Sequence, residues 1–173
     1  MPILDDLKAQ FGDKILASGD RLGEPTVRVA PGDWVAVASW LKGEQGFSMF
    51  VDLHGVHWPQ RPEPFDAVAL VRNPQTMDLV RIKCATAESV PTLTGVWAGA
   101  DWCEREAFDL FGIRFEGHPN LKRIYMPDDY PLHPMRKDVT LDGVQANATY
   151  DQEFEAFPQP GTQGDTTDKR NLG

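Results

Sequence analysis

The sequence predicts a two-layer α+β domain, in which helices cover one face of a small, mixed, largely antiparallel sheet. Helical and strand-like patterns follow one another in the order helix, strand, helix, three strands, helix, as such a domain requires. The chain has 173 residues, 41% of them hydrophobic, which suits one compact core with extensions. After the last helix, recurring prolines predict an extended C-terminal segment instead of a second domain.

Two amphipathic helices are expected in the first part of the chain. Residues 3–11 place apolar side chains at helical spacing and stop at Gly12, and residues 34–41 do the same before Gly43. Between them, residues 26–29 alternate between apolar and polar as a strand does. We expect the helices to pack on one face of the sheet.

The middle of the chain predicts three strands. Residues 47–54 alternate with period two, 65–72 form a short apolar run, and 79–85 alternate again. A proline-rich loop at 57–64 and an Asn-Pro-Gln turn at 73–75 separate them. Short connections of this kind indicate an antiparallel meander.

The last predicted helix is preceded by residues 89–99, which indicate one or two irregular helical turns. Asp101 stands three residues before Glu104, which is the spacing of a capping box, so the helix is expected to begin at Trp102. Gly112 ends it, because glycine readily takes the left-handed conformation of a C-terminal cap.

Charged side chains recur at four-residue steps on this helix. Asp101, Arg105 and Asp109 form one stripe in which the arginine is expected to pair with both carboxylates. The opposite stripe is apolar and contains Cys103, Ala107, Leu110 and Phe111.

The residues from this helix onward resemble a known signature. The ordered motifs are Glu104-Arg105-Glu106, Asp109-Leu110-Phe111-Gly112, His118-Pro119, Lys122-Arg123-Ile124 and His133-Pro134-Met135-Arg136-Lys137-Asp138. Together they resemble the family of the C subunit of the proton-pumping NADH:quinone oxidoreductase, respiratory complex I. Two positions depart from that pattern: Tyr125 stands where a smaller aliphatic residue is usual, and Leu132 stands where glycine is common.

The resemblance implies a structural and assembly subunit of the peripheral arm, which docks on the hydrogenase-related large D subunit near the quinone site. It also implies that flavin, iron–sulfur clusters and quinone are bound by partner subunits and that this chain has no active site of its own. The complex would couple NADH oxidation and quinone reduction to proton translocation. Its place would be the cytoplasmic side of the cell membrane, where partner subunits hold it.

Two related assemblies share the signature. It also resembles the J subunit of the cyanobacterial and plastid complex that takes electrons from ferredoxin, and subunits of membrane-bound hydrogenases. Because the electron donor binds elsewhere in these complexes, the motifs do not separate the three.

Composition agrees with protein partners. The net charge is −9 and the sequence pI about 4.8, which argues against nucleic acid or an anionic membrane surface as the main partner. Cys84 and Cys103 are the only cysteines and cannot supply the four ligands of a usual cluster or zinc site, so we expect two reduced thiols. The N-terminus has no signal-peptide pattern, and no run of about 18 apolar residues predicts a membrane span.

The chain is expected to divide into a compact domain at 1–113, an extended partner-docking segment at 114–157 and a disordered tail at 158–173. Between residues 114 and 137, five basic residues face three acidic ones, and we expect arginines there to bind carboxylates of a partner. Tyr150, Phe154 and Phe157 are expected as anchors. The predicted docking residues are Arg114, His118, Lys122, Arg123, His133, Arg136, Lys137 and Asp138.

A function of another class remains open from the residues alone. A free-standing hydrolase could use Glu104, Glu106, Asp109 and His118, because carboxylates one helical turn apart can converge. The simpler interpretation is structural, with Glu104 as a cap and the two histidines before proline, His118 and His133, hydrogen-bonded to backbone. His54 and His57 are expected on opposite faces of a strand, which argues against a metal site there.

Overall fold

The computed structural model describes residues 2–139. Its helices are α1 (Pro2–Phe11), α2 (Pro31–Gly43) and α3 (Ala100–Phe111), with a 3-10 turn, η1 (Gly12–Lys14), after the first. Its strands are β1 (Ile15–Arg21), β2 (Glu24–Val29), β3 (Met49–His57), β4 (Phe65–Arg72), β5 (Leu79–Thr86), β6 (Ser89–Pro91) and β7 (Arg114–Glu116). The predicted α+β class is confirmed. The expected anchors Tyr150, Phe154 and Phe157, and the expected tail, lie outside the described residues.

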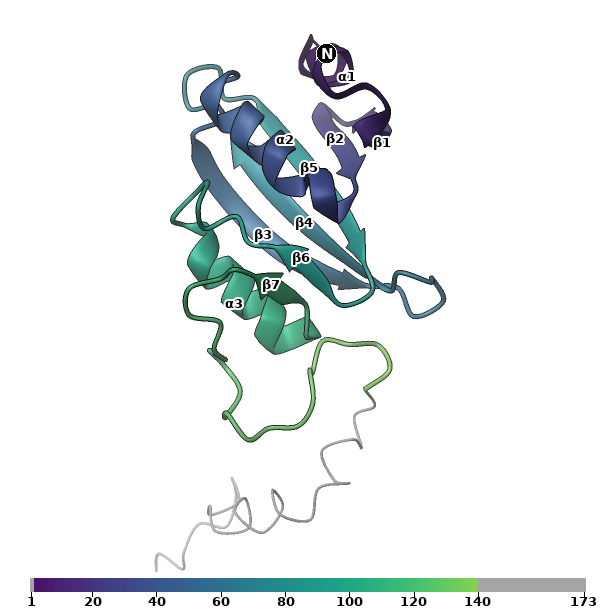
Figure 1. Cartoon of the computed structure of the whole chain (residues 1–173), viewed down its shortest axis with the longest axis vertical. Helices are drawn as coiled ribbons and strands as arrows, with labels where there is room; N and C mark the ends of the chain where they lie inside the picture. Colours follow the sequence, from purple (N-terminus) through teal and green to yellow (C-terminus); the bar gives the residue numbers. More distant parts are fainter. Residues whose placement is uncertain (1, 140–173) are drawn as a thin grey trace, which may run out of the picture. The chain divides into compact units, whose positions relative to one another are not determined.

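Five strands form a mixed sheet in the order β1-β2-β5-β4-β3 (Figure 1). All neighbours are antiparallel except β2 and β5, which run parallel. The predicted meander of β3, β4 and β5 is therefore present. The sequence did not predict strand β1, because its Gly-Asp-Arg-Leu-Gly end is typical of a loop. Leu22 and Gly23 both have positive φ, 59° and 79°, and form the tight turn of a β1–β2 hairpin.

The hydrophobic core lies on one face of this sheet. Helix α2 crosses the sheet on that face, and α3 lies beside β3 (Figure 1). Leu7 of α1, Trp34 of α2 and Ala107 of α3 join strand residues such as Ala69 and Ile82 in one buried cluster. Leu7, Trp34, Ala69 and Ile82 are fully shielded from solvent, and Ala107 almost so. The helices thus stabilise the sheet by covering a single face, as predicted.

A β-bulge in β3 changes which side chains face this core. The register with β4 shifts between Phe50 and Asp52, so the predicted alternation holds only from Leu53 onward. Met49 and Val51 are exposed, by 48% and 41%, whereas Phe50 packs against the core beside the ring of Trp97. An extra residue in one strand inverts the side-chain phase, which the sequence pattern alone did not reveal.

A second, two-stranded parallel sheet joins β6 to β7. The prediction of helical turns over 89–99 is therefore wrong at its start, where Ser89–Pro91 is extended. A single helical turn follows instead, with the amides of Val96 and Trp97 bonded to the carbonyl of Leu93. Strand β7, the partner of β6, comes after α3 in the sequence, so no local pattern could have predicted the pairing.

The compact unit that contains this fold extends to Asp138. The predicted end of the compact domain, at residue 113, lies well before that point, because the chain after α3 packs back onto the helix. Among residues 2–139, no helix combines the length and the apolar character that a membrane crossing demands.

Candidate docking surface

Helix α3 begins earlier than predicted and without a capping box. Its N-cap is Gly99, which makes no side-chain cap. Glu104 lies on the core-facing side of the helix, where it is fully buried. There it accepts hydrogen bonds from the Thr92 hydroxyl at 2.5 Å and the Leu93 amide at 2.6 Å. Glu104 therefore fixes the turn after β6 and does not cap its own helix.

Burial dominates the electrostatics of Glu104. Loss of water raises the pKa of this carboxyl to about 7, while the Thr92 and Leu93 hydrogen bonds oppose the shift and Asp101 adds to it. Near neutral pH the group is therefore close to half protonated.

His118 ties the chain after β7 to the first turn of α3. Its Nδ1 accepts the Asn120 amide at 3.0 Å, so Nε2 carries the proton and lies 3.2 Å from the Asp101 carbonyl. The same Nε2 is 3.0 Å from the Asp101 carboxylate and 3.9 Å from that of Glu104. The His118 side chain is completely buried, and its bonding to backbone agrees with the simpler interpretation made from the sequence.

Asp109 is the main attachment point of the extended segment. One carboxylate oxygen accepts the amides of Ile124, Tyr125 and Met126 at 2.9, 2.7 and 3.0 Å. The other accepts Arg123 Nη1 at 2.7 Å. The Asp109 side chain is fully buried, and that of Arg123 is 12% exposed. Successive backbone amides around one oxygen form an anion-binding nest, here occupied by the protein's own carboxylate.

The protonation of Asp109 follows from these donors. Burial on its own would raise the pKa, but the three amides and Arg123 outweigh it and hold the pKa of Asp109 below its usual value. The carboxylate is therefore ionised at neutral pH and neutralises Arg123. This overturns the expectation that Arg123 reaches a carboxylate of a partner: it binds one on its own α3.

Arg105 also differs from its predicted pairing. It makes no ion pair with Asp101 or Asp109 among the described residues, and instead donates to the carbonyls of Lys122 and Arg123. Its guanidinium lies 4.7 Å from the ring centre of Trp102. Arg105 therefore helps to hold residues 122–123 against the helix.

The side chain of His133 packs against the C-terminal end of α3. Gly112 has φ 80° and ψ 15°, so the predicted left-handed cap is present. A Cβ added there would come within 2.7 Å of the His133 ring, whose Nδ1 donates to the Asp109 carbonyl at 2.9 Å. Glycine is thus required both by backbone conformation and by close approach.

The predicted docking residues fall into three groups. His118, Arg123 and His133 point inward and attach the segment to α3, as described above. Arg136 makes a bidentate pair with Asp138 and lies over the Phe65 ring at 5.1 Å. The outward group consists of cations that are exposed: Arg114, Lys122 and Lys137.

Large exposed side chains accompany these cations and were missed as docking candidates. Trp102, Tyr125 and Met135 are exposed by 61%, 58% and 56%. Aromatic residues and methionine are enriched at protein interfaces. A signal existed for Tyr125, which the sequence shows at a position where the resembling family has a smaller residue, but only the fold identifies Trp102 as solvent-facing.

The last part of the segment is anchored to the sheet. The Lys137 amide donates to His57 Nδ1 at 2.9 Å, and His57 is buried and stacked on Phe65 with ring centres 4.9 Å apart. His54 is exposed and bonded to Asp52. The two histidines of β3 thus face opposite ways, as predicted, and His57 has an anchoring contact that sequence spacing did not suggest.

Most of the residues considered for a hydrolase make structural hydrogen bonds instead. The carboxylate of Glu104 accepts from Thr92 and Leu93, and that of Asp109 accepts from Arg123. Among the described residues, no three acidic, histidine or cysteine side chains gather closely enough to hold a metal ion. Cys84 and Cys103 are free thiols, and burial raises the pKa of each, that of Cys84 to about 12.

Comparison with known proteins places this geometry in a family. The family described as "Respiratory-chain NADH dehydrogenase, 30 Kd subunit" matches residues 27–145. The chain is 40% identical over 146 residues to the C subunit of the NADH-quinone oxidoreductase of Sinorhizobium medicae, covering 82% of this chain and 72% of that relative. A relative from a Sulfurihydrogenibium species, named as a C/D subunit of NADH-quinone oxidoreductase, is 38% identical over 143 residues, which are 80% of this chain and 24% of that protein.

A solved structure shares the fold. It is a chain of the membrane-bound sulfane sulfur reductase, an archaeal respiratory membrane complex, and it superposes with a TM-score of 0.71 over 95% of this chain and 96% of that one, at 20% identity. The family match covers the whole signature segment that packs on α3, and the sequence identity extends over most of the domain. The chain therefore belongs to the family of the 30 Kd subunit of the respiratory-chain NADH dehydrogenase.

Proposed function

We propose that this chain is a structural and assembly subunit of a proton-pumping NADH:quinone oxidoreductase and docks on the large D subunit near the quinone site. The observation that carries the proposal is the relative named as a C/D subunit, in which the part similar to this chain is 24% of one longer protein. Two modules joined in one polypeptide meet at high effective concentration. Their fusion supports contact between the corresponding separate subunits.

The surface of α3 and the segment after it suits such docking. Arg114, Lys122 and Lys137 offer charges to solvent, and Trp102 and Tyr125 offer exposed aromatic area. Interfaces of standard size take about 800 Å² from each partner and concentrate their binding energy in a few aromatic and arginine side chains. Because Asp109 and His133 already hold the segment in place, docking would cost little ordering entropy.

In this proposal the chain has no catalytic site of its own. Two buried carboxylates are engaged by the chain itself: Glu104 binds the turn after β6, and Asp109 binds the segment after α3. Flavin, iron–sulfur clusters and quinone would be bound by partner subunits. The chain would lie on the cytoplasmic side of the cell membrane and contact the membrane through those partners.

The test is affinity purification of the tagged chain from native membranes, with identification of the subunits that come with it. We expect the large D subunit and a module that accepts electrons from NADH. Recovery of a ferredoxin-dependent complex or of a hydrogenase would replace the complex named here by one of these relatives. Recovery of the chain alone would contradict the proposal.

A charge variant tests the docking surface. Lys122→Glu combined with Lys137→Glu should reduce the recovery of the large D subunit at least about tenfold, since opposite charges are replaced by like ones. The matched control, Lys8→Glu with Lys14→Glu, makes the same charge change on exposed residues near the N-terminus and should leave recovery intact. Equal recovery with both double variants would rule out these two lysines as docking residues.

A further inference from the structure

The sheet has a second face that no helix of residues 2–139 covers. The strand residues of the hydrophobic core, among them Ala67, Ala69 and Ile82, all lie on the first face, together with the helices. Their neighbours along the strands point the other way. On that opposite face Val68 and Ala85 are 2% and 8% exposed, yet neither belongs to the core cluster.

This open face carries several cations, although the chain as a whole has a net charge of −9. Arg28 and Lys83 are register partners on β2 and β5, and Arg81 lies two residues from Lys83 on the same face. Arg61 reaches the face from the loop before β4. Two carboxylates pair with these cations: Asp66 with Arg28 and Arg61, and Glu24 with Arg81.

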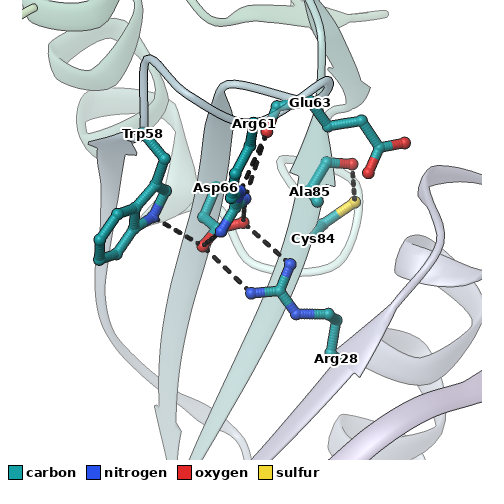
Figure 2. Close-up of polar contacts among 7 residues, drawn as sticks. All are labelled: Arg28, Trp58, Arg61, Glu63, Asp66, Cys84 and Ala85. Carbon is teal, nitrogen blue, oxygen red and sulfur yellow. Dashed lines mark hydrogen bonds and ion pairs between the residues drawn. The ribbon is translucent and has the colours of Figure 1, made fainter.

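The charge of the Asp66 carboxylate is neutralised by two arginines. The Arg28 and Arg61 guanidinium groups and the Trp58 indole converge on it (Figure 2). The Asp66 side chain is 4% exposed, whereas those of Arg28 and Arg61 are 31% and 33% exposed. Two guanidinium groups thus share one carboxylate, and part of each remains open to solvent. Because a guanidinium has five N–H donors, both arginines keep donors for another acceptor.

Lys83 has no ion pair among the described residues. It lines a shallow hollow of about 290 Å³ with Arg28, Thr26 and residues 17–21 of β1. The one carboxylate in that hollow, Asp20, accepts the Gly23 amide of the hairpin turn. The hollow is therefore a place where an additional carboxylate would meet two cations of the face.

The size of the face limits what can occupy it. Five strands spaced about 4.8 Å apart and about 20 Å long present roughly 500 Å². That is less than the roughly 800 Å² per partner of a standard interface, but enough for one extended segment of about six residues, which spans about 20 Å.

We propose that the helix-free face of the five-stranded sheet is a second docking surface, which binds an extended acidic segment of a partner subunit through Arg28, Arg81 and Lys83. It lies on β2 and β5, away from the α3 surface, and would let the chain hold two segments of its complex at once. The proposal rests on the proposed function in that it requires an assembly with other subunits.

A zero-length carbodiimide cross-link tests the contact directly, because it couples a lysine amine only to a carboxylate that touches it. The complex is purified through a tag on this chain, treated and digested, and the peptides joined to Lys83 are identified by mass spectrometry. We expect an Asp- or Glu-containing peptide of another subunit. Lys83→Arg keeps the charge but lacks the amine, so it should lose this cross-link while the complex keeps its composition.

The matched binding experiment uses charge reversal. Lys83→Glu should release the cross-linked subunit, or loosen it about tenfold, at a salt concentration that the unaltered complex withstands. The control Lys8→Glu, on the exposed side of α1, should not. The large D subunit should remain with all three variants if it is held only by the α3 surface.

Each alternative outcome overturns the proposal. Cross-links from Lys83 only within its own chain, or to a second copy together with a dimer by light scattering, would assign the face to something else. A complex in which Lys122 and Lys137 are cross-linked to other subunits but Lys83 is not would leave the face without a partner while preserving the proposed function. Failure to recover any complex would contradict the proposed function itself.

Discussion

Two buried aspartates hold this molecule together in different ways. Asp109 binds three consecutive backbone amides and one arginine, all supplied by residues 123–126. Asp66 binds side chains only, from Arg28 on β2 and from Trp58 and Arg61 in the loop before β4. Backbone donors are fixed by the course of the chain, so Asp109 dictates the path of a segment. Side-chain donors can turn to another acceptor, so Asp66 joins elements without fixing their exposed arginines.

Removal of Asp109 should have the largest effect. Asp109→Ala leaves three amides and the largely buried Arg123 without their acceptor, so we expect the free energy of unfolding to fall by about 3 to 5 kcal/mol. Chemical denaturation measures it. Asp109→Asn keeps one oxygen for the amides and should lose less. A loss below about 1 kcal/mol for the alanine variant would mean that residues 123–126 do not depend on this carboxylate.

Gly112→Val perturbs the backbone at the C-terminal end of α3, close to Asp109. Valine resists the positive φ, and its Cβ would push against the His133 ring, so the expected loss is about 2 to 3 kcal/mol. Gly95→Val is the control, since a Cβ there meets nothing within 4 Å and Gly95 does not have positive φ. Similar thermal midpoints for the two variants would show that His133 moves aside without cost.

Asp66→Ala should cost less than Asp109→Ala, about 1 to 2 kcal/mol, because Arg28 and Arg61 are each about one third exposed and water can solvate them. The measurement is again the midpoint and slope of denaturation. An equal or larger loss than for Asp109→Ala would show that side-chain donors bind as rigidly as backbone ones, and the contrast between the two sites would disappear.

The pH dependence of stability sharpens the comparison further. Glu104 has its pKa raised to about 7, so between about 4.3 and 7 the folded chain holds a proton that the unfolded chain has lost. Its contribution to stability therefore falls as the pH rises through this window, by at most about 1.4 kcal/mol per pH unit. Glu104→Gln should flatten that part of the curve. An unchanged slope in the variant would assign it to another group.

The two aspartates act at the opposite end of the pH range. Burial opposes the ionisation of each, but the hydrogen bonds and arginines around them prevail and lower both pKa values. Their stabilisation is present above the unfolded pKa of about 3.9 and is lost as the pH falls through the folded values. The Glu104→Gln variant should therefore keep its acid unfolding.

Local signals predicted what local structure determines. The strand at 65–72, the helix end at Gly112 and the helix at 34–41 each follow from residues close in sequence, and the structure has them. The β-bulge at Val51 broke the period-two pattern that otherwise located its strand. The capping-box spacing is local and pointed to Glu104 as a cap, whereas its true partners lie eleven and twelve residues earlier.

The candidate surfaces were predictable only in part. The resemblance identified the segment from Arg114 to Asp138, but not which side chains point outward. The sequence gives no sign that Arg123 is paired, because its partner Asp109 lies on α3 and meets it only in the folded chain. The pairing of Arg28 with Asp66 spans 38 positions, and no helical or strand periodicity connects residues so far apart. Sequence patterns report on neighbours, whereas a docking surface is defined by the residues that the fold leaves uncovered.

The parallel pairing of β2 with β5 has a consequence for the order of folding. The β1–β2 hairpin and the β3–β4–β5 meander can each form from strands adjacent in sequence, and chain closure over short loops is fast. Joining them pairs Thr26 with Arg81, which requires α2 and two strands to be enclosed in the loop. Loop closure over such a distance precedes any gain from the contact. We expect the docking of hairpin on meander to limit the folding rate, and substitutions at this seam to slow folding more than those in either half.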